Sequence, residues 1–363
     1  MAKTQEIVSN IEQSIDKIKK KEHKTVFIVP DTKGNGRACV SVIYRQAMAL
    51  NQAGYNVALL LEKKDSIKPS VWLGEEYDNL PHSSIQEIGG TFKVGPQDFL
   101  IIPELFGNVI QQTQKLPCKR VILAQSYDYI LDMLPPGTNW TSLGVNTFIT
   151  TSETIKQEIN KLFPTTNGYV INPQIPSYFN NKNSLKKPII AIMCRDDRTT
   201  SKIVKTFYLK YPLYSFITFR DIKQIPREEL SNVLNDYFLS VWVDEYSSFG
   251  TFPVESIRCG TPVIGKVPMI QPEWITEKNG IWLFDELQIP EAIAIFSKNF
   301  FEDIEDLELL NEIKGMENKY TEEEQSKQIK DVYTKIFNER KEELKINISR
   351  LSEPNNLEQP IVL

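Results

Sequence analysis

Short, continuously apolar runs alternate along this chain with longer segments whose apolar residues recur every three or four positions. In the first half, the apolar runs predict buried strands at 26–30, 57–61, 99–102, 121–124 and 147–149. The segment after the first run is apolar at helical spacing from Val40 to Leu50, and Gly54 follows as a stop. Ser152 is placed to cap a further helix that runs to about Phe163. Unbroken apolar strands separated by helices are typical of a parallel sheet that is covered on both faces.

The alternation starts again after a polar stretch at 177–187, which predicts a linker. The second series predicts strands at 189–194, 214–219, 238–243, 262–264 and 281–284. Predicted helices lie between them, at 199–210, 227–235 and 253–259. We therefore predict an α/β fold with two tandem Rossmann-like, doubly wound parallel sheets. Their carboxyl edges are expected to face each other across a cleft, because ligands bind beyond the strand ends of such sheets.

These patterns give five predicted parts of the chain. The Rossmann-like domains span 22–183 and 184–320, and a C-terminal helix at 321–348 crosses back before a flexible tail at 349–363. Residues 1–21 predict an amphipathic helix with an isoleucine stripe from Ile7 to Ile18. This helix packs on the body in our first interpretation and lies on a membrane surface in the second.

Composition narrows the class of protein. The length of 363 residues suits two domains, and 41% apolar with 25% charged residues is typical of a soluble globular protein. No long apolar run or secretory leader is present, and four scattered cysteines suggest a reducing compartment, so a cytoplasmic location is expected. Two histidines make a multi-histidine metal site improbable. The net charge of −5 argues against nucleic-acid binding.

The residues at 244–265 concentrate the candidate chemistry. A predicted strand ends at Val243, a loop with Ser247 and Gly250 follows, and a helix opens near Pro253. Unpaired N–H groups at a helix start bind anions and hydroxyls, and glycine lets a ligand approach the backbone. Glu255 lies in the first helical turn, where a carboxylate can accept hydrogen bonds from vicinal hydroxyls such as a ribose diol.

This stretch resembles the donor-site signature of glycosyltransferase family 4, of the GT-B fold, which reads Glu-Gly-Phe-Gly-Leu-Pro-x-x-Glu-Ala-x-x-x-Gly-x-Pro-Val. The matching residues are Phe249, Gly250, Glu255, Gly260, Pro262 and Val263. The resemblance implies that Glu255 binds the ribose of a nucleotide-sugar, and that the loop from Phe249 to Thr251 lies by its sugar and diphosphate. The family's first glutamate falls on Ser247. Either Glu245 replaces it in catalysis, or Ser247 hydrogen-bonds the sugar itself.

The resemblance also covers the end of the predicted strand at 189–194. The family places an arginine there, which Arg195 matches, and positive charge at this point stabilises a departing nucleoside diphosphate. The family's second cation corresponds to Lys202 or Arg198. For each of these two residues, a solvated surface cation at the start of a helix is an equally good interpretation.

On the N-terminal side the resemblance is looser. It implies that the loop with Gly34, Gly36 and Arg37 contacts the donor phosphate and the acceptor, although a tight strand-to-helix turn explains the same residues. The family often carries a histidine after the fourth strand, where this chain has Gln125. Gln125 is expected to hydrogen-bond the sugar, and Asp128 either orients the acceptor or caps a turn.

The resemblance implies a glycosyltransferase that moves a sugar from a nucleotide-diphosphate sugar to a hydroxyl acceptor, such as a polysaccharide or lipid-linked glycan. Retention of anomeric configuration is implied, and no metal or cofactor is expected beyond the donor substrate. One alternative is glycosylation of hydroxymethylated bases in viral DNA, against which the acidic net charge argues. Another is a non-catalytic sugar-nucleotide or glycan-binding protein. A dehydrogenase is discounted, because Gly34 and Gly36 are not followed by the third glycine of its fingerprint.

Overall fold

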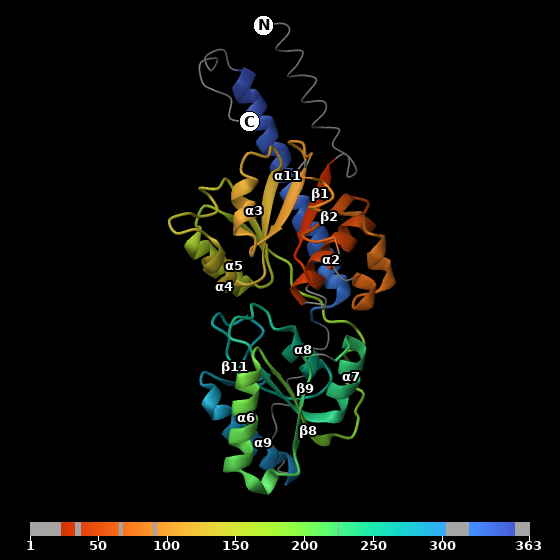
Figure 1. The fold of residues 1–363 in the computed structure, drawn as a ribbon, viewed down its shortest axis with the longest axis vertical. Coiled ribbons are helices and arrows are strands. Elements are labelled where there is room, and N and C mark those ends of the chain that lie inside the picture. The colour runs from red at the N-terminus through yellow and green to blue at the C-terminus, as the bar shows by residue number, and fades with distance from the viewer. Residues whose placement is uncertain are drawn as a thin grey trace. The chain divides into compact units, whose positions relative to one another are not determined.

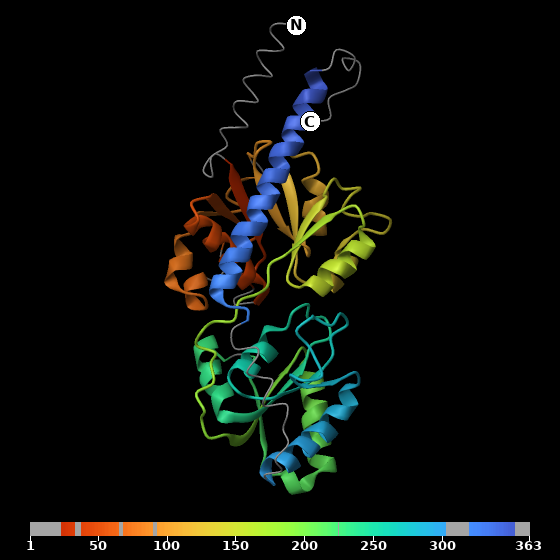
Figure 2. The ribbon, with the colours of Figure 1, turned by 180° about the vertical axis from the view of Figure 1, so that it is seen from behind.

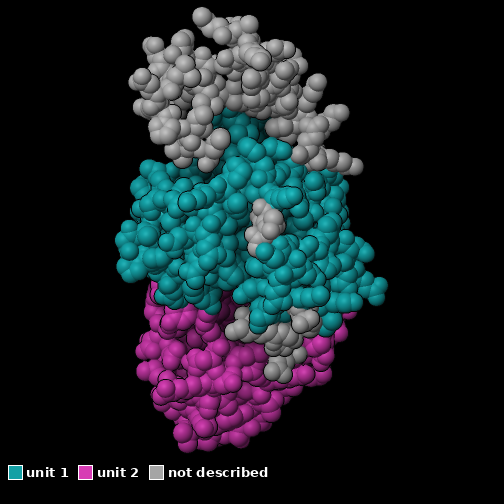
Figure 3. All heavy atoms as spheres, turned by 45° about the horizontal axis from the view of Figure 1, so that its top comes forward, with its two compact units in different colours: residues 1–150, 159–171, 326–363 teal, residues 151–158, 172–325 magenta. Residues whose placement is uncertain are grey.

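The computed structural model describes residues 23–32, 38–64, 68–89, 93–223, 225–302 and 319–352. The predicted N-terminal helix, the loop with Gly34, Gly36 and Arg37, and the predicted tail beyond Ser352 lie outside these ranges. The chain forms two compact units (Figure 3). Unit 1 comprises Met1–Thr150, Ile159–Ile171 and Ser326–Leu363, and unit 2 comprises Thr151–Glu158 and Asn172–Gln325.

Unit 1 is built on a seven-stranded sheet in which all strand pairs are parallel. Its strands, in spatial order, are β3 (His82–Ser84), β2 (Asn56–Leu61), β1 (Lys24–Val29), β4 (Phe99–Pro103), β5 (Lys119–Ala124), β6 (Thr147–Thr150) and β7 (Asn167–Val170). Central strands such as β4 and β5 are buried along their whole length, which explains their continuous apolar runs. The strand order reverses between β1 and β4, and this switch point is where such sheets bind ligands.

Helices cover both faces of this sheet (Figures 1 and 2). They are α2 (Ala38–Gln52), α3 (Gly107–Gln112), α4 (Tyr127–Met133) and α11 (Glu322–Ser352), with the 3-10 turns η1 (Pro69–Val71) and η2 (Glu75–Asn79). Helix α5 (Glu153–Leu162) begins in unit 2 and ends in unit 1. Ile329, Tyr333 and Ile336 of α11 share a core with α2 and the strands. The C-terminal helix therefore crosses back onto the N-terminal sheet, as predicted. Helices α3 and α4 lie on the opposite face.

Unit 2 contains a five-stranded parallel sheet with two hydrophobic cores. Its strands, in spatial order, are β12 (Ile281–Leu283), β11 (Val263–Lys266), β10 (Tyr237–Val243), β8 (Lys187–Cys194) and β9 (Thr218–Asp221). One core includes α6 (Asp197–Lys210) and α9 (Ile289–Phe301), and the other includes α7 (Arg227–Asp236) and α8 (Thr251–Arg258). The remaining turns are η3 (Pro212–Tyr214) and η4 (Glu286–Gln288). Here the strand order reverses between β10 and β8, which defines the switch point of unit 2.

The predicted fold class is confirmed, with some differences in detail. The stretch at 177–187 groups with unit 2, and the chain changes unit at 150–151, 158–159, 171–172 and 325–326. The reason is that Ile175 and Phe179 are buried in the core of unit 2. The strand predicted at 214–219 begins only at Thr218, because Pro212 opens a 3-10 turn before it. The cleft between the two sheets stays a prediction.

Candidate functional site

The switch point of unit 2 holds the arginine that the sequence singles out. Arg195 follows β8, and its backbone N–H donates to the carbonyl of Val243 at 2.9 Å, which ties it to the end of β10. Its guanidinium Nη1 donates to Asp244 Oδ1 at 3.0 Å, and its guanidinium carbon Cζ lies 4.9 Å from the ring centre of Tyr246. The side chain of Arg195 is 41% exposed. The strand edge therefore presents an oriented cation that solvent can reach.

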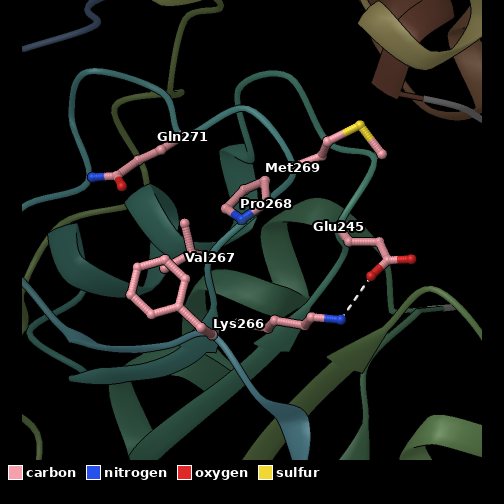
Figure 4. A pocket seen from close by; sticks show the side chains of 7 residues that line it. Glu245, Lys266, Val267, Pro268, Met269 and Gln271 are labelled. Atoms are coloured by element: carbon pink, nitrogen blue, oxygen red, sulfur yellow. Dashed lines mark hydrogen bonds and ion pairs between the residues drawn. The ribbon is translucent and has the colours of Figure 1, made fainter.

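A second ion pair lies at the ends of β10 and β11. Lys266 Nζ is 2.6 Å from Glu245 Oε2 (Figure 4). The hydrogen bond from Lys266 lowers the pKa of Glu245, and the same bond raises the pKa of Lys266, so both groups are charged at neutral pH. This pair borders a pocket of about 460 Å³ whose other walls are largely apolar. The pocket is lined by Glu245, Lys266, Val267, Pro268, Met269, Gln271 and Phe284.

The loop before α8 depends on a glycine. Gly250 has φ 72° and ψ 78°, and an added Cβ would lie 2.8 Å from the ring of Trp242. No side chain caps the start of α8 at Gly250, so the first N–H groups from Thr251 onward have no side-chain cap partner. Phe249, in contrast, is 4% exposed, and its carbonyl accepts a hydrogen bond from Trp274 Nε1 at 2.7 Å. The Phe249 side chain thus belongs to the core.

Glu255, the predicted ribose ligand, faces inward from α8. Its side chain is fully buried, and Oε1 accepts a hydrogen bond from Nη2 of Arg227 at the start of α7. Burial by itself acts to lower the pKa of Arg227, but the charge of Glu255 raises it above its usual value. Glu255 Oε2 has no hydrogen-bond partner. The sequence predicts an open carboxylate here, whereas the structure places it behind Arg227 with one oxygen unsatisfied.

The other predicted residues of unit 2 lie around this edge. The backbone N–H of Ser247 donates to the carbonyl of Asp244 at 3.3 Å, within the loop that follows β10. Lys202 Nζ lies 3.8 Å from Glu286, so its partner belongs to η4 rather than to the Arg195 pair. Arg198 is exposed in the first turn of α6. Both side chains are exposed on α6, and their role at the donor site stays a prediction.

In unit 1, Gln125 Nε2 donates to the carbonyl of Cys39 at 2.9 Å and so links the end of β5 to α2. Asp128 lies in the first turn of α4, where a carboxylate stabilises the helix start. Glu104 was not predicted as a site residue; it directly follows β4 and is 4% exposed. Burial raises the pKa of Glu104 to about 7, while hydrogen bonds from backbone N–H groups act against this rise. The sequence signal that could have identified Glu104 is an acidic residue directly after an apolar strand.

Two further properties concern the residues that the structure describes. In that part of the chain, no three or more His, Cys, Asp or Glu side chains are grouped to hold a metal ion. Among the helices that the structure describes, none is long and apolar enough to cross a membrane.

Comparisons with known proteins point to one class of enzyme. No family model matches the sequence. The alpha-1,6-glucosyltransferase of Actinobacillus pleuropneumoniae serotype 7 (strain AP76) is 22% identical over 307 residues, which cover 79% of this chain and 88% of the relative. The crystal structure of TarM matches with a TM-score of 0.64 at 9% identity, covering 88% of this chain and 99% of TarM. The lipopolysaccharide outer core galactosyltransferase WaaB, in its apo form, matches with a TM-score of 0.58 at 11% identity, covering 86% and 99%.

The fold is therefore the GT-B fold, with two parallel Rossmann-like sheets. The class of protein that the fold and the curated relative define is a glycosyltransferase.

Proposed function

We propose that this chain is a retaining, metal-independent glycosyltransferase of family 4, which transfers a sugar from a nucleotide-diphosphate sugar to a hydroxyl group of a glycan. The observation that carries the proposal is the oriented, solvent-accessible guanidinium of Arg195 at the switch point of unit 2. Parallel sheets bind their ligands at this point, and the leaving group of such a reaction is a dianion that needs a fixed cation.

In the proposed complex the donor diphosphate replaces Asp244 as the partner of Arg195. Lys266 supplies a second cation when the diphosphate draws it from Glu245, and the N–H groups at the start of α8 add further donors. The bond between the anomeric carbon and the diphosphate oxygen breaks, and the acceptor oxygen bonds to that carbon on the same face. The departing phosphate takes the proton of the acceptor hydroxyl, so the step needs no side-chain base.

Glu255 is the proposed ribose ligand. Its Oε2 is buried without a partner and can accept a hydrogen bond from a ribose hydroxyl, while Oε1 keeps Arg227. Satisfying that oxygen removes a cost that the ligand-free chain carries, which favours donor binding.

The curated relative is an alpha-1,6-glucosyltransferase by its description, which favours a glucosyl donor. The similar fold of WaaB, an outer core lipopolysaccharide enzyme by its description, supports a polysaccharide or lipid-linked acceptor rather than DNA. Because its relative is an enzyme, we rank a non-catalytic sugar-binding role below transfer.

The test is a thermal-shift screen of the full chain with UDP-, GDP- and CMP-sugars, followed by measurement of nucleotide release. A ligand at 100 times its Kd adds about 2.7 kcal/mol to stability, which raises the Tm by several degrees. Glu255→Gln should abolish most of the shift. The matched control is Glu229→Gln, an exposed carboxylate on α7 that pairs with Arg220.

A Tm that no nucleotide-sugar moves, together with absence of nucleotide release, would contradict the proposal. A shift that Glu255→Gln leaves intact would remove Glu255 from the donor site.

A further inference from the structure

Exposed apolar side chains lie at the amino edge of the unit 2 sheet, opposite the edge that holds Arg195. We call four of them the apolar patch: Leu209 in the last turn of α6, Leu213 in η3, Phe216 in the turn before β9, and Phe301 at the end of α9. Their exposed fractions are 83%, 88%, 52% and 41%. Single exposed apolar residues are ordinary, but a group of them in one region marks a surface that another molecule covers.

The fold brings the patch together because α6 and α9 both end at this edge. Helix α6 follows the carboxyl end of β8, and η3 then leads into the start of β9, so α6 ends at the amino edge. Helices α6 and α9 lie side by side and share a core (Figures 1 and 2). The rings of Phe216 and Phe301 are in contact, with centroids 5.3 Å apart. The turn before β9 and the end of α9 therefore form one continuous surface.

Lysines border the apolar patch. Although the whole chain has a net charge of −5, no acidic residue occurs from 198 to 220. Lys205 and Lys210 of α6 and Lys298 of α9 are exposed, and none of the three forms an ion pair with another described residue. Lys205 precedes Leu209 by four residues, a spacing that places both on one side of the helix. Glu302, directly after α9, is the acidic residue that borders the patch in sequence. The surface is thus apolar with a positive margin.

We propose that the apolar patch docks unit 2 onto an anionic lipid surface. Leucine and phenylalanine side chains enter the boundary between headgroups and acyl chains, and the lysines contact the negative headgroups. The charge favours lipid over a second copy of this chain, because a symmetric dimer would bring the same lysines of two copies together. The inference goes beyond the proposed transfer reaction and does not depend on it, since the patch and Arg195 lie at opposite edges of the sheet.

The test is co-sedimentation of the full chain with lipid vesicles. One set of vesicles contains phosphatidylcholine alone, and the other contains equal amounts of phosphatidylglycerol and phosphatidylcholine. Leu213→Ser removes the most exposed side chain of the patch, and the double variant Lys205→Ala/Lys210→Ala removes two of its lysines. All three side chains are exposed, so these variants are expected to fold.

Matched controls come from unit 1. Val71→Ser removes an apolar side chain that is 68% exposed in η1. The double variant Lys327→Ala/Lys330→Ala removes two exposed lysines of α11. The thermal shift with nucleotide-sugars is measured for every variant in parallel, which checks the fold and reports on the donor site separately.

We expect the wild type to bind the anionic vesicles more tightly than the neutral ones, and to release them as salt screens the headgroups. Lys205→Ala/Lys210→Ala should lower the partition constant about 25-fold, at about fivefold for each lysine near an anionic surface. Leu213→Ser should lower it about 10-fold, because a leucine side chain is no longer buried in the lipid. Both controls should stay within about twofold of the wild type.

Equal binding to the two kinds of vesicle, no binding by the wild type, or equal losses in the control variants would overturn the inference. So would a dimer in lipid-free solution that Leu213→Ser abolishes, seen by size-exclusion chromatography with light scattering, because the patch would then serve self-association. Vesicle binding through the patch, in a chain that neither binds nor hydrolyses any nucleotide-sugar, would refute the proposed function and leave the docking surface standing.

Discussion

The two sheet edges of this protein handle polar groups in opposite ways. At the edge of unit 2 the charged side chains are paired with one another, as in Arg195 with Asp244 and Lys266 with Glu245. At the edge of unit 1, Glu104 and Thr150 are buried and keep an oxygen without any partner.

The two arrangements have different consequences for stability and binding. A paired surface cation is stable in water, and a diphosphate can exchange for its carboxylate partner at little cost. An unsatisfied buried oxygen destabilises the empty protein, but a neutral hydroxyl can satisfy it without bringing any charge into the interior. Paired charges therefore suit an anionic donor, whereas unsatisfied buried oxygens lower the stability of unit 1.

The largest expected effect concerns the ion pair between Arg227 and the buried Glu255 in unit 2. Arg227→Met leaves Glu255 buried without its partner and should lower stability by about 3–5 kcal/mol, measured by chemical denaturation. The double variant with Glu255→Gln should recover much of this loss. The surface pair Arg220–Glu229 gives the control, since Arg220→Met should cost less than about 1 kcal/mol. Equal costs for Arg227→Met and Arg220→Met would show that burial of Glu255 does not matter.

The next effect is catalytic and concerns Arg195. Arg195→Ala should lower kcat for transfer by about 10²–10³-fold, because a fixed charge at the leaving group is lost. Asp244→Asn removes only the exchangeable partner and should change kcat far less. A kcat that Arg195→Ala leaves unchanged would mean that the exposed pairs of unit 2 are only surface ion pairs.

A pH dependence should separate unit 1 from unit 2. The folded pKa of Glu104 lies near 7 and is raised by burial, whereas the unfolded value is near 4.5. Between these values the folded state binds more protons than the unfolded state, so the contribution of Glu104 to stability falls as pH rises from 4.5 to 7. The loss is about 3 kcal/mol, and Glu104→Gln should remove it. Parallel stability–pH curves for Glu104→Gln and the wild type would contradict the burial of an ionisable group there.

The smallest effect compares two glycines. Gly54 (φ 87°) in unit 1 has open space where a Cβ would lie, whereas Gly250 (φ 72°) has Trp242 at 2.8 Å. Gly54→Ala should cost about 1 kcal/mol from backbone strain alone, and Gly250→Ala about 2 kcal/mol or more because the ring must also move. Thermal denaturation of both variants measures the difference. If Gly54→Ala cost as much as Gly250→Ala, the contact with Trp242 would not be the cause.

The sequence by itself determined the elements and their class. Unbroken apolar runs predicted the central strands because both of their faces are buried, and helical spacing predicted the helices between them. The short strands β3 and β7 were missed, because His82–Ser84 and Asn167–Val170 carry polar or partly exposed residues and lack a long apolar run. Arg195 and Gly250 could be placed at a strand end and a loop because both positions are local.

Only the tertiary structure decided which side chains meet. Glu255 and Arg227 lie 28 residues apart. Nothing local in either segment predicted that Glu255 would be buried and would form an ion pair with Arg227. Glu104 and Thr150 are brought to one face by strand register across β5, which is a property of the whole sheet. Hydrophobic periodicity records how each segment meets the core, whereas partners and unsatisfied atoms depend on contacts between distant segments, which no local pattern encodes.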